Sequence, residues 1–270
     1  MADKEKGMSR KYFGIVICIL FAIMYILVES VAAPYFEGAI WYCTRSALRV
    51  LFFIVELFIF IRFYDKETAG NVIFFKGFKK GLFAGIAMFL FIPFVIITYF
   101  IVGAPEWADI SISIVLSYLI LEQLSVALFE EFTFRAFVME GYFLEENKTV
   151  STKIMYALIS AVVFGIFHAQ AATTMNSAII RFVITGIWGF AFASVYIYSH
   201  NILAAMFIHF ITDVVVNSTN LIKEWTPSNL MTILDNYVYF IVLGIILVTA
   251  AFFIIGTLGN EKDDPKIEEV

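Results

Sequence analysis

The segment from Ile202 to Leu221 reads ILAAMFIHFITDVVVNSTNL. A helix of this length and apolarity can cross a bilayer, because about 20 residues at roughly 1.5 Å each span its hydrocarbon core. His209, Asp213 and Asn217 recur at every fourth position, so they share one face of that helix. A polar stripe on an apolar helix faces the interior of a bundle or water, not lipid. This segment therefore predicts an all-α, polytopic membrane helix bundle with an internal polar site.

The composition of the whole chain points to the same class of protein. Of its 270 residues, 61% are hydrophobic and 15% are charged, against roughly 45–50% and about 25% in soluble domains. This excess excludes a soluble enzyme and a disordered regulator. Two cysteines without C-x-x-C spacing exclude a disulfide framework and a zinc knuckle. The net charge is −5 without a basic tract, so we expect a lipid bilayer as partner and no nucleic acid.

Eight apolar runs are long enough to be transmembrane helices, and we expect them to form one integral membrane domain over residues 1–270. The runs are Tyr12–Ala33, Leu48–Tyr64, Leu82–Val102, Ile110–Phe129, Ile154–Ala169, Ala178–Tyr198, Ile202–Leu221 and Met231–Ile255. An even number places both termini on one side of the membrane. Most of the 18 basic residues lie in the tails and connections on that side, so both termini are predicted to be cytoplasmic.

The first cluster of ionisable residues inside these runs is Glu130-Glu131 with Arg135. A charged residue at the bilayer centre costs about 2.5–3.5 kcal/mol on insertion scales, so such residues are functional candidates. Glu131 and Arg135 are four apart and can pair. Glu130 lies about 100° further round the helix, free to point elsewhere, and a buried carboxylate without a cation suits a general base for water. The alternative is an interfacial group of charges that marks the end of a helix.

Two further clusters are Phe164-Gly-Ile-Phe-His168 on the fifth run and His209-Phe-Ile-Thr-Asp213 on the seventh. A lone intramembrane histidine more often bonds between helices than acts in catalysis. However, the helix lengths place Glu130, His168 and His209 at compatible depths in the membrane. The three clusters can therefore meet in one site.

These motifs, E-E-x-x-x-R, F-x-x-x-H and H-x-x-x-D, resemble those of the CPBP family in their order and in the type of helix that carries them. That family includes the type II CAAX prenyl endopeptidases and bacteriocin-processing and self-immunity proteins. The resemblance covers about residues 110–221 and implies a membrane-embedded, glutamate-dependent peptidase acting on a membrane-associated, prenylated or leader peptide. By resemblance, the catalytic residues are Glu130, His168, His209 and Asp213, and the supporting residues are Glu131 and Arg135.

Asp213 departs from the pattern of the type II CAAX enzymes, which have Asn at this position. An Asn can donate a hydrogen bond to an oxyanion, whereas an ionised Asp cannot. Asp213 therefore orients His209, is protonated in its apolar surroundings, or helps to hold a metal. The departure also weakens the expectation of a prenylated CAAX tail as substrate.

The resemblance also implies the label metalloprotease, with Glu130, His168 and His209 as tentative ligands of Zn²⁺. Two histidines and a carboxylate are a permissible zinc set. The chain has no H-E-x-x-H motif, so activation of water with and without a metal both stay open.

Two other functions are compatible with the same residues. A non-catalytic family member could act as a bacteriocin-immunity or scaffolding protein, because a fold does not determine a function. Buried Glu, His and Asp also serve in transporters and proton relays, although the sequence shows no repeated half of the kind that transporters have.

Four other ionisable residues receive less specific predictions. Glu29 and Glu56 are expected to pair with Arg45, with Arg49 or with each other. Glu122 lies two turns before Glu130. One alternative for Glu122 is therefore that it faces the same cavity as Glu130. His200 lies in a connection and is expected to be solvated.

Overall fold

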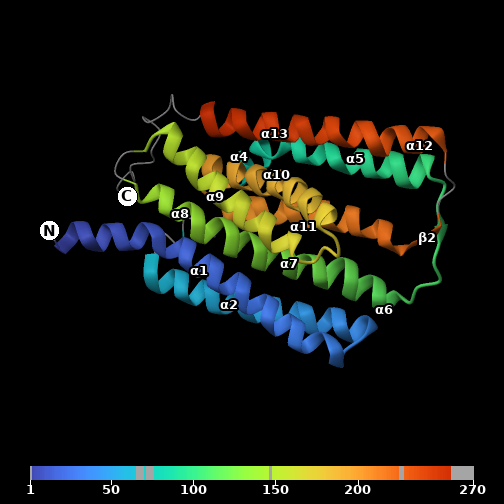
Figure 1. The fold of residues 1–270 in the computed structure, drawn as a ribbon, viewed down its shortest axis with the longest axis horizontal. Coiled ribbons are helices and arrows are strands. Elements are labelled where there is room, and N and C mark those ends of the chain that lie inside the picture. The colour runs from blue at the N-terminus through green and yellow to red at the C-terminus, as the bar shows by residue number, and fades with distance from the viewer. Residues whose placement is uncertain (1, 65–69, 71–75, 146–147, 225–227, 257–270) are drawn as a thin grey trace.

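The computed structural model describes residues 2–64, 70, 76–145, 148–224 and 228–256, which form a bundle of helices along one long axis (Figure 1). The first helices are α1 (Ala2–Ala32), α2 (Gly38–Tyr64), α4 (Phe78–Ala84), α5 (Phe91–Val95), α6 (Ile112–Val115), α7 (Gln123–Glu131) and α8 (Phe137–Phe143). The others are α9 (Val150–Ala169), α10 (Met175–Ser199), α11 (Ile202–Ser218), α12 (Asn229–Ile233) and α13 (Tyr239–Gly256). Strands β1 (Glu106–Trp107) and β2 (Ile222–Glu224) form a small antiparallel sheet.

Six helical stretches in the described part of the chain are long and apolar enough to cross a membrane. They are Tyr12–Tyr35, Ile112–Phe143, Val150–Ala169, Met175–Ser199, Ile202–Leu221 and Asn229–Gly256. A seventh span is obtained if Phe78–Ala84 and Ile86–Val102, which are bent by 58° relative to each other, count as one. The prediction of an all-α polytopic bundle is confirmed, and the chain is an integral multi-pass membrane protein.

The predicted number of eight spans is not confirmed, because the second predicted span is not among these stretches. It corresponds to α2, which carries Arg45, Arg49, Glu56 and Arg62 along its length. These charges are spread along the helix, whereas a lipid-facing span carries few. α2 instead packs along α7 and the turns on either side of it, and Arg45, Arg49 and Glu56 find their partners there.

The fourth predicted span, Ile110–Phe129, is too short. The helical stretch runs from Ile112 to Phe143 through α6, α7 and α8, with π-helical turns at Leu116–Glu122 and Phe132–Ala136. The E-E-x-x-x-R motif therefore lies in the middle of a long helix and not at its end. Charges usually mark the boundary of a span, but here they are buried, as is Glu140 further along the same helix.

The helices that carry the two motif histidines have well-defined starts. α9 begins with a capping box, in which the hydroxyl of Thr149 accepts from the backbone N–H of Thr152 at 3.2 Å. α11 begins at Asn201, whose Oδ1 accepts from the N–H of Ala204 at 2.9 Å and whose Nδ2 donates to the carbonyl of Lys76 at 3.0 Å. These contacts supply partners for backbone N–H groups that the first helical turn leaves free.

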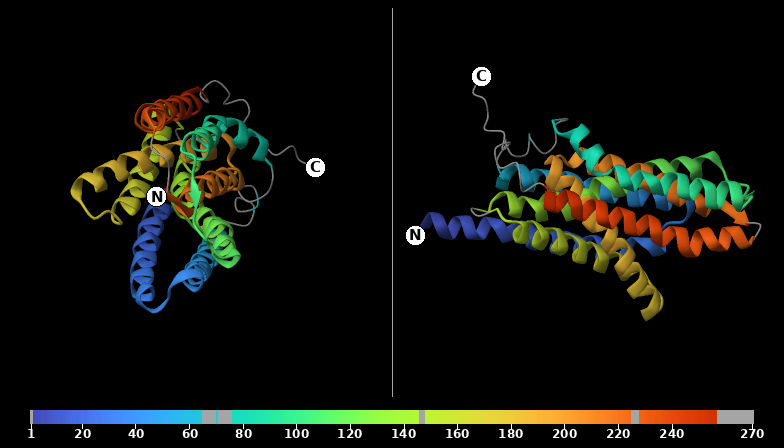
Figure 2. Two further views of the ribbon diagram at one scale, coloured as in Figure 1. Left: turned by 90° about the vertical axis from the view of Figure 1, so that its right-hand side faces the viewer. Right: turned by 90° about the horizontal axis from the view of Figure 1, so that it is seen from above.

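The long helices enclose α7 in the centre of the bundle. α9 and α10 pack as a hairpin, α13 covers α10, and α7 lies against both α2 and α11. Figure 2 shows α1 and α2 as a pair on one flank, with α1 also contacting α8. The small sheet lies at the end of the bundle remote from the N-terminus (Figure 1). This arrangement positions α7, α9 and α11 around a common interior.

Close packing of α1 on α8 depends on a glycine. A Cβ atom at Gly14 would overlap the carbonyl oxygen of Phe137 and would lie 2.8 Å from the hydroxyl of Tyr64. A Cβ atom at Gly244 on α13, by contrast, would have no other atom within 4 Å. The first glycine is required by its surroundings and the second is not.

We expect Gly14→Ala to destabilise the protein by about 1–3 kcal/mol, because the added methyl forces α1 and α8 apart. The thermal unfolding midpoint of the purified protein in detergent measures this effect. Gly244→Ala is the matched control and should leave the midpoint unchanged. Equal midpoints for the two variants would contradict the packing of α1 on α8.

Candidate active site

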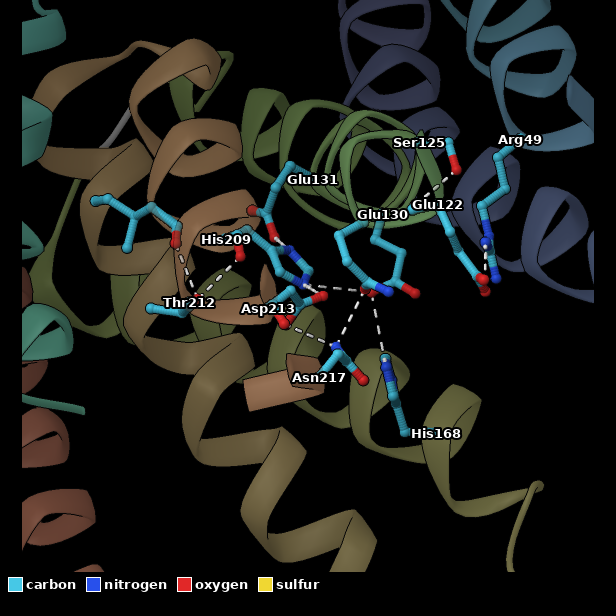
Figure 3. Close-up of polar contacts among 12 residues, drawn as sticks. Arg49, Glu122, Ser125, Glu130, Glu131, His168, His209, Thr212, Asp213 and Asn217 are labelled. Atoms are coloured by element: carbon cyan, nitrogen blue, oxygen red, sulfur yellow. Dashed lines mark hydrogen bonds and ion pairs between the residues drawn. The ribbon is translucent and has the colours of Figure 1, made fainter. Parts of the chain in front are cut away.

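Three helices bring the predicted site residues together in one place (Figure 3). Glu130 Oε2 on α7 lies 3.7 Å from His168 Nε2 on α9 and 3.9 Å from His209 Nε2 on α11. These separations are too long for direct hydrogen bonds, and they suit a water molecule shared by the three groups. Glu130 is 4% exposed, and its Oε2 has no hydrogen-bond partner among the described residues. The site therefore contains a buried carboxylate oxygen that faces two imidazoles.

His168 has its ring orientation set by its own helix. Its Nδ1 lies 3.0 Å from the carbonyl oxygen of Phe164, one turn earlier. A carbonyl can accept but not donate, so Nδ1 carries the hydrogen and the neutral ring has its lone pair on Nε2. That lone pair faces Glu130. His168 is also the more open of the two site histidines, with 30% of its side chain exposed.

His209 is buried and lies between two carboxylates. Its Nδ1 is 2.6 Å from Glu131 Oε1, and its Nε2 is 3.3 Å from Asp213 Oδ2. The contact with Asp213 follows from the spacing of four residues on one helix. The contact with Glu131 comes from α7 and was not predicted, because nothing in the sequence relates those two positions.

Glu131 and Arg135 form the ion pair that their spacing predicts. Arg135 Nη1 lies 3.2 Å from Glu131 Oε1, and both side chains are fully buried. The pair has poor hydrogen-bond geometry, and the guanidinium nitrogens have no hydrogen-bond partner among the described residues. The alternative, in which these charges mark the end of a helix, is wrong, since the π-helical turn Phe132–Ala136 continues into α8.

Two aromatic rings flank the Arg135 guanidinium. Its Cζ lies 4.1 Å from the centroid of the Phe164 ring and 5.0 Å from that of Phe192. Phe164 packs on His168 at 4.3 Å between centroids, and Phe192 stacks on His209 at 4.7 Å. Cation–π contacts are worth about 2 kcal/mol or more when desolvated. Arg135 therefore holds two rings that each position one site histidine, which explains the phenylalanine in F-x-x-x-H.

The residues do not fit the tentative zinc set well. The lone pair of His168 and the carboxylate of Glu130 are donors that zinc accepts. His209, however, has both ring nitrogens directed at carboxylates. Among the described residues, no group of three His, Cys, Asp or Glu side chains is arranged to hold a metal ion. The label metalloprotease is therefore unsupported, and zinc at Glu130, His168 and His209 stays a prediction.

An amide network that the motifs did not indicate adjoins the site. Asn217, one turn beyond Asp213, donates to Gln123 Oε1 at 3.1 Å, and Tyr118 donates to Asn217 Oδ1 at 3.1 Å. The network joins α11 to α7 and to the π-helical turn before it. In the sequence, this network was indicated only by the polar residues at every fourth position of α11.

The predictions for the other ionisable residues have mixed outcomes. Glu29 pairs with Arg45 at 2.9 Å as expected. Glu56 was expected to pair with Arg45, Arg49 or Glu29, but it accepts a hydrogen bond of 2.6 Å from the hydroxyl of Thr133. His200 is not simply solvated, because its Nε2 lies 2.6 Å from the buried Glu140.

Removing the cation of the buried pair should leave Glu131 with an uncompensated charge. We expect Arg135→Met to cost about 3–5 kcal/mol of stability, the range for breaking a buried ion pair from one side. The double variant Glu131→Gln/Arg135→Met should regain a large part of this loss, because neither charge then remains. Chemical denaturation of the purified proteins measures both values. A double variant less stable than Arg135→Met would contradict the pairing.

Comparison with known protein families identifies the segment that contains this geometry. Residues 112–215 match a family described as Rce1-like, type II CAAX prenyl endopeptidase Rce1-like. Comparisons with curated proteins and with solved structures found no match. The matched segment contains all three motifs and the helices α6 to α11, apart from the last turn of α11. Residues 112–215 are therefore similar to the Rce1-like family of intramembrane proteases, and over this segment the match confirms the resemblance to the CPBP family that the motifs indicated.

Proposed function

We propose that the chain is an intramembrane endopeptidase in which Glu130 activates a water molecule for attack on a peptide carbonyl. The observation that carries the proposal is the unpartnered Glu130 Oε2, 3.7 and 3.9 Å from the Nε2 atoms of His168 and His209. A general base must reach the proton it removes at about 2.6–3.2 Å or through one water. The match of residues 112–215 to a protease family supports the same chemistry.

Glu130 and His168 can orient the attacking water. A carboxylate oxygen and the lone pair of a neutral imidazole are both acceptors, so each can take one of the two O–H bonds of a water between them. The oxygen lone pairs then point away from both groups, toward a bound carbonyl carbon. On attack, a bond forms between the water oxygen and the carbonyl carbon, and one proton moves to Glu130. Collapse breaks the C–N bond, and that proton passes to the leaving amine.

His209 and Asp213 are assigned to the developing oxyanion. When protonated, the ring of His209 donates from both nitrogens, with Nδ1 directed to Glu131 and Nε2 to Asp213. Nε2 is also 3.9 Å from Glu130 Oε2, so its hydrogen can turn from Asp213 to the oxyanion as that charge forms. The 3.3 Å contact supports the first of the three roles considered for Asp213, which is to orient His209. Donors aimed at the oxyanion typically contribute about 10²–10³ in kcat.

The proposed substrate is a membrane-associated peptide, prenylated or carrying a leader. The site lies among helices of a multi-pass membrane protein, so a substrate must approach from within or beside the bilayer. His168 and Asp213 are the more exposed members, with 30% and 26% of their side chains accessible. A peptide can therefore approach from the side of α9 and α11.

We expect Glu130→Gln and His168→Gln each to reduce kcat by about 100-fold or more, because proton transfer by a positioned side chain contributes roughly 10²–10⁴ in rate. Cleavage of a peptide panel by purified protein measures this, with mass spectrometry to locate the cleaved bond. Glu106→Gln, which removes an exposed carboxylate outside the site, is the control and should retain full activity.

Undiminished cleavage by both site variants would contradict the mechanism. The immunity or scaffolding alternative predicts two results. Wild-type protein would cleave no peptide, and cells carrying the Glu130→Gln or His168→Gln variant would keep their resistance to the bacteriocin. Proton or ion flux in vesicles that survives both substitutions would favour a transporter.

Zinc at Glu130, His168 and His209 is tested separately by elemental analysis of the purified protein. The proposed chemistry uses side chains alone, so we expect less than one equivalent of zinc and full activity after dialysis against a chelator. One equivalent in wild type that is lost in His168→Gln, together with loss of activity on chelation, would establish a zinc enzyme.

A further inference from the structure

Four charged residues that the proposed mechanism does not use form a chain beside the site. Glu122 Oε1 lies 2.9 Å from Arg45 Nη2 and 3.4 Å from Arg49 Nη1, and Arg45 Nε lies 2.9 Å from Glu29 Oε1. Glu122 lies two turns before Glu130 on the same helical stretch, and in the view of Figure 3 the pair of Arg49 and Glu122 lies to one side of Glu130. Three of the four residues lie on α1 and α2, outside the matched family segment.

The chain of charges has a buried part and an accessible part. The side chains of Arg49 and Glu122 are 5% and 4% exposed, whereas those of Arg45 and Glu29 are 25% and 24% exposed. Arg49 Nε, Glu122 Oε2 and also Arg45 Nε are individually buried and have no hydrogen-bond partner among the described residues. The buried part is therefore incompletely satisfied, and the accessible part is where a further group can reach it.

Charge balance shows what kind of group the cluster requires. Arg45, Arg49 and Glu122 together carry one net positive charge inside the bundle. An uncompensated charge in such surroundings is costly, so the cluster needs one more anion. Glu29 supplies it through one contact at the accessible side. The Arg45–Glu29 pair is partly exposed, so displacing Glu29 by another anion costs less than breaking the buried Arg49–Glu122 pair.

The orientation of the arginines is maintained without Glu29. The guanidinium of Arg45 lies 5.4 Å from the ring centroid of Trp41, and that of Arg49 lies 5.3 Å from Tyr25. Both cations are thus held by aromatic faces as well as by Glu122. An incoming carboxylate would find a preorganised pair of donors.

We propose that Arg45, supported by Arg49, is a subsite for an anionic group of the substrate, and that Glu29 occupies this subsite when substrate is absent. The inference rests on the proposed function, since it names a group that the peptide substrate carries. The anion is either the C-terminal carboxylate of the peptide or an acidic side chain near that end.

Binding of three peptides to the purified full-length protein tests the subsite without depending on cleavage. The probe is a fluorescein-labelled heptapeptide that ends in farnesyl-cysteine, Val, Ile and Ala, made with a free carboxylate or with a carboxamide. The third peptide is a carboxamide with Asp as its last residue. Fluorescence polarisation gives the Kd of each. We expect wild type to bind the carboxylate peptide about tenfold more tightly than the neutral carboxamide.

Two substitutions should act in opposite directions. Arg45→Gln should weaken binding of the carboxylate peptide about tenfold and leave the neutral carboxamide unchanged. Glu29→Gln removes the internal competitor and should tighten binding of the carboxylate peptide several-fold, again without effect on the carboxamide. Lys223→Gln, which removes an exposed cation remote from Arg45 along the chain, is the control and should change neither.

The third peptide distinguishes the two sources of the anion. If the Asp carboxamide binds like the free carboxylate, the subsite accepts a side chain; if it binds like the neutral carboxamide, the subsite requires the chain terminus. Equal binding of all three peptides by wild type, or equal weakening of all three by Arg45→Gln, would overturn the proposal. Discrimination between peptides without any cleavage would support the subsite and contradict the peptidase.

Discussion

Burial of the Glu131–Arg135 ion pair in the middle of a membrane helix is the constraint on which the rest of the site depends. Two charges in an apolar interior are tolerated only with good partners, because each loses several kcal/mol of hydration. Here the cation is shared between one carboxylate and the faces of Phe164 and Phe192. Each ring in turn packs on one of the site histidines. The ion pair therefore determines where α7, α9 and α11 can sit relative to one another.

The adjacent acids Glu130 and Glu131 acquire different roles from the geometry of one helix. Glu131 contacts both Arg135 and His209 through the same oxygen. Glu130 lies about 100° round the helix. Its Oε2 is 3.9 Å from His209 Nε2 and has no hydrogen-bond partner among the described residues, so this carboxylate is available for a water molecule. One helical turn thus carries two carboxylates with different roles: Glu131 stabilises the structure, and Glu130 serves the proposed chemistry. Exchanging their positions would leave the cation without a partner and the water without a base.

Much of this arrangement follows from local rules, and the rest depends on contacts that spacing does not encode. The spacing of four residues predicted the pairs Glu131–Arg135 and His209–Asp213, and apolar runs predicted most of the helices. The bond between Glu131 and His209 joins residues 78 positions apart, and a single sequence does not relate them. The fourth span was predicted to end at Phe129 because charges normally end a span, whereas Glu131 and Arg135 pair inside the bundle and the span continues to Phe143. The partners of Glu56 and His200 were misjudged because each contacts a residue on a helix distant in the sequence.

The central claim is that Glu130, His168 and His209 act on one peptide bond. A cryo-EM structure of the Glu130→Gln protein in a lipid nanodisc with an uncleaved peptide tests it most directly. The account predicts that the scissile carbonyl lies beside residue 130, with the Nε2 atoms of His168 and His209 on either side of it and a water molecule within about 3.2 Å of His168 Nε2. A peptide bound elsewhere, or histidines that line separate cavities, would contradict it.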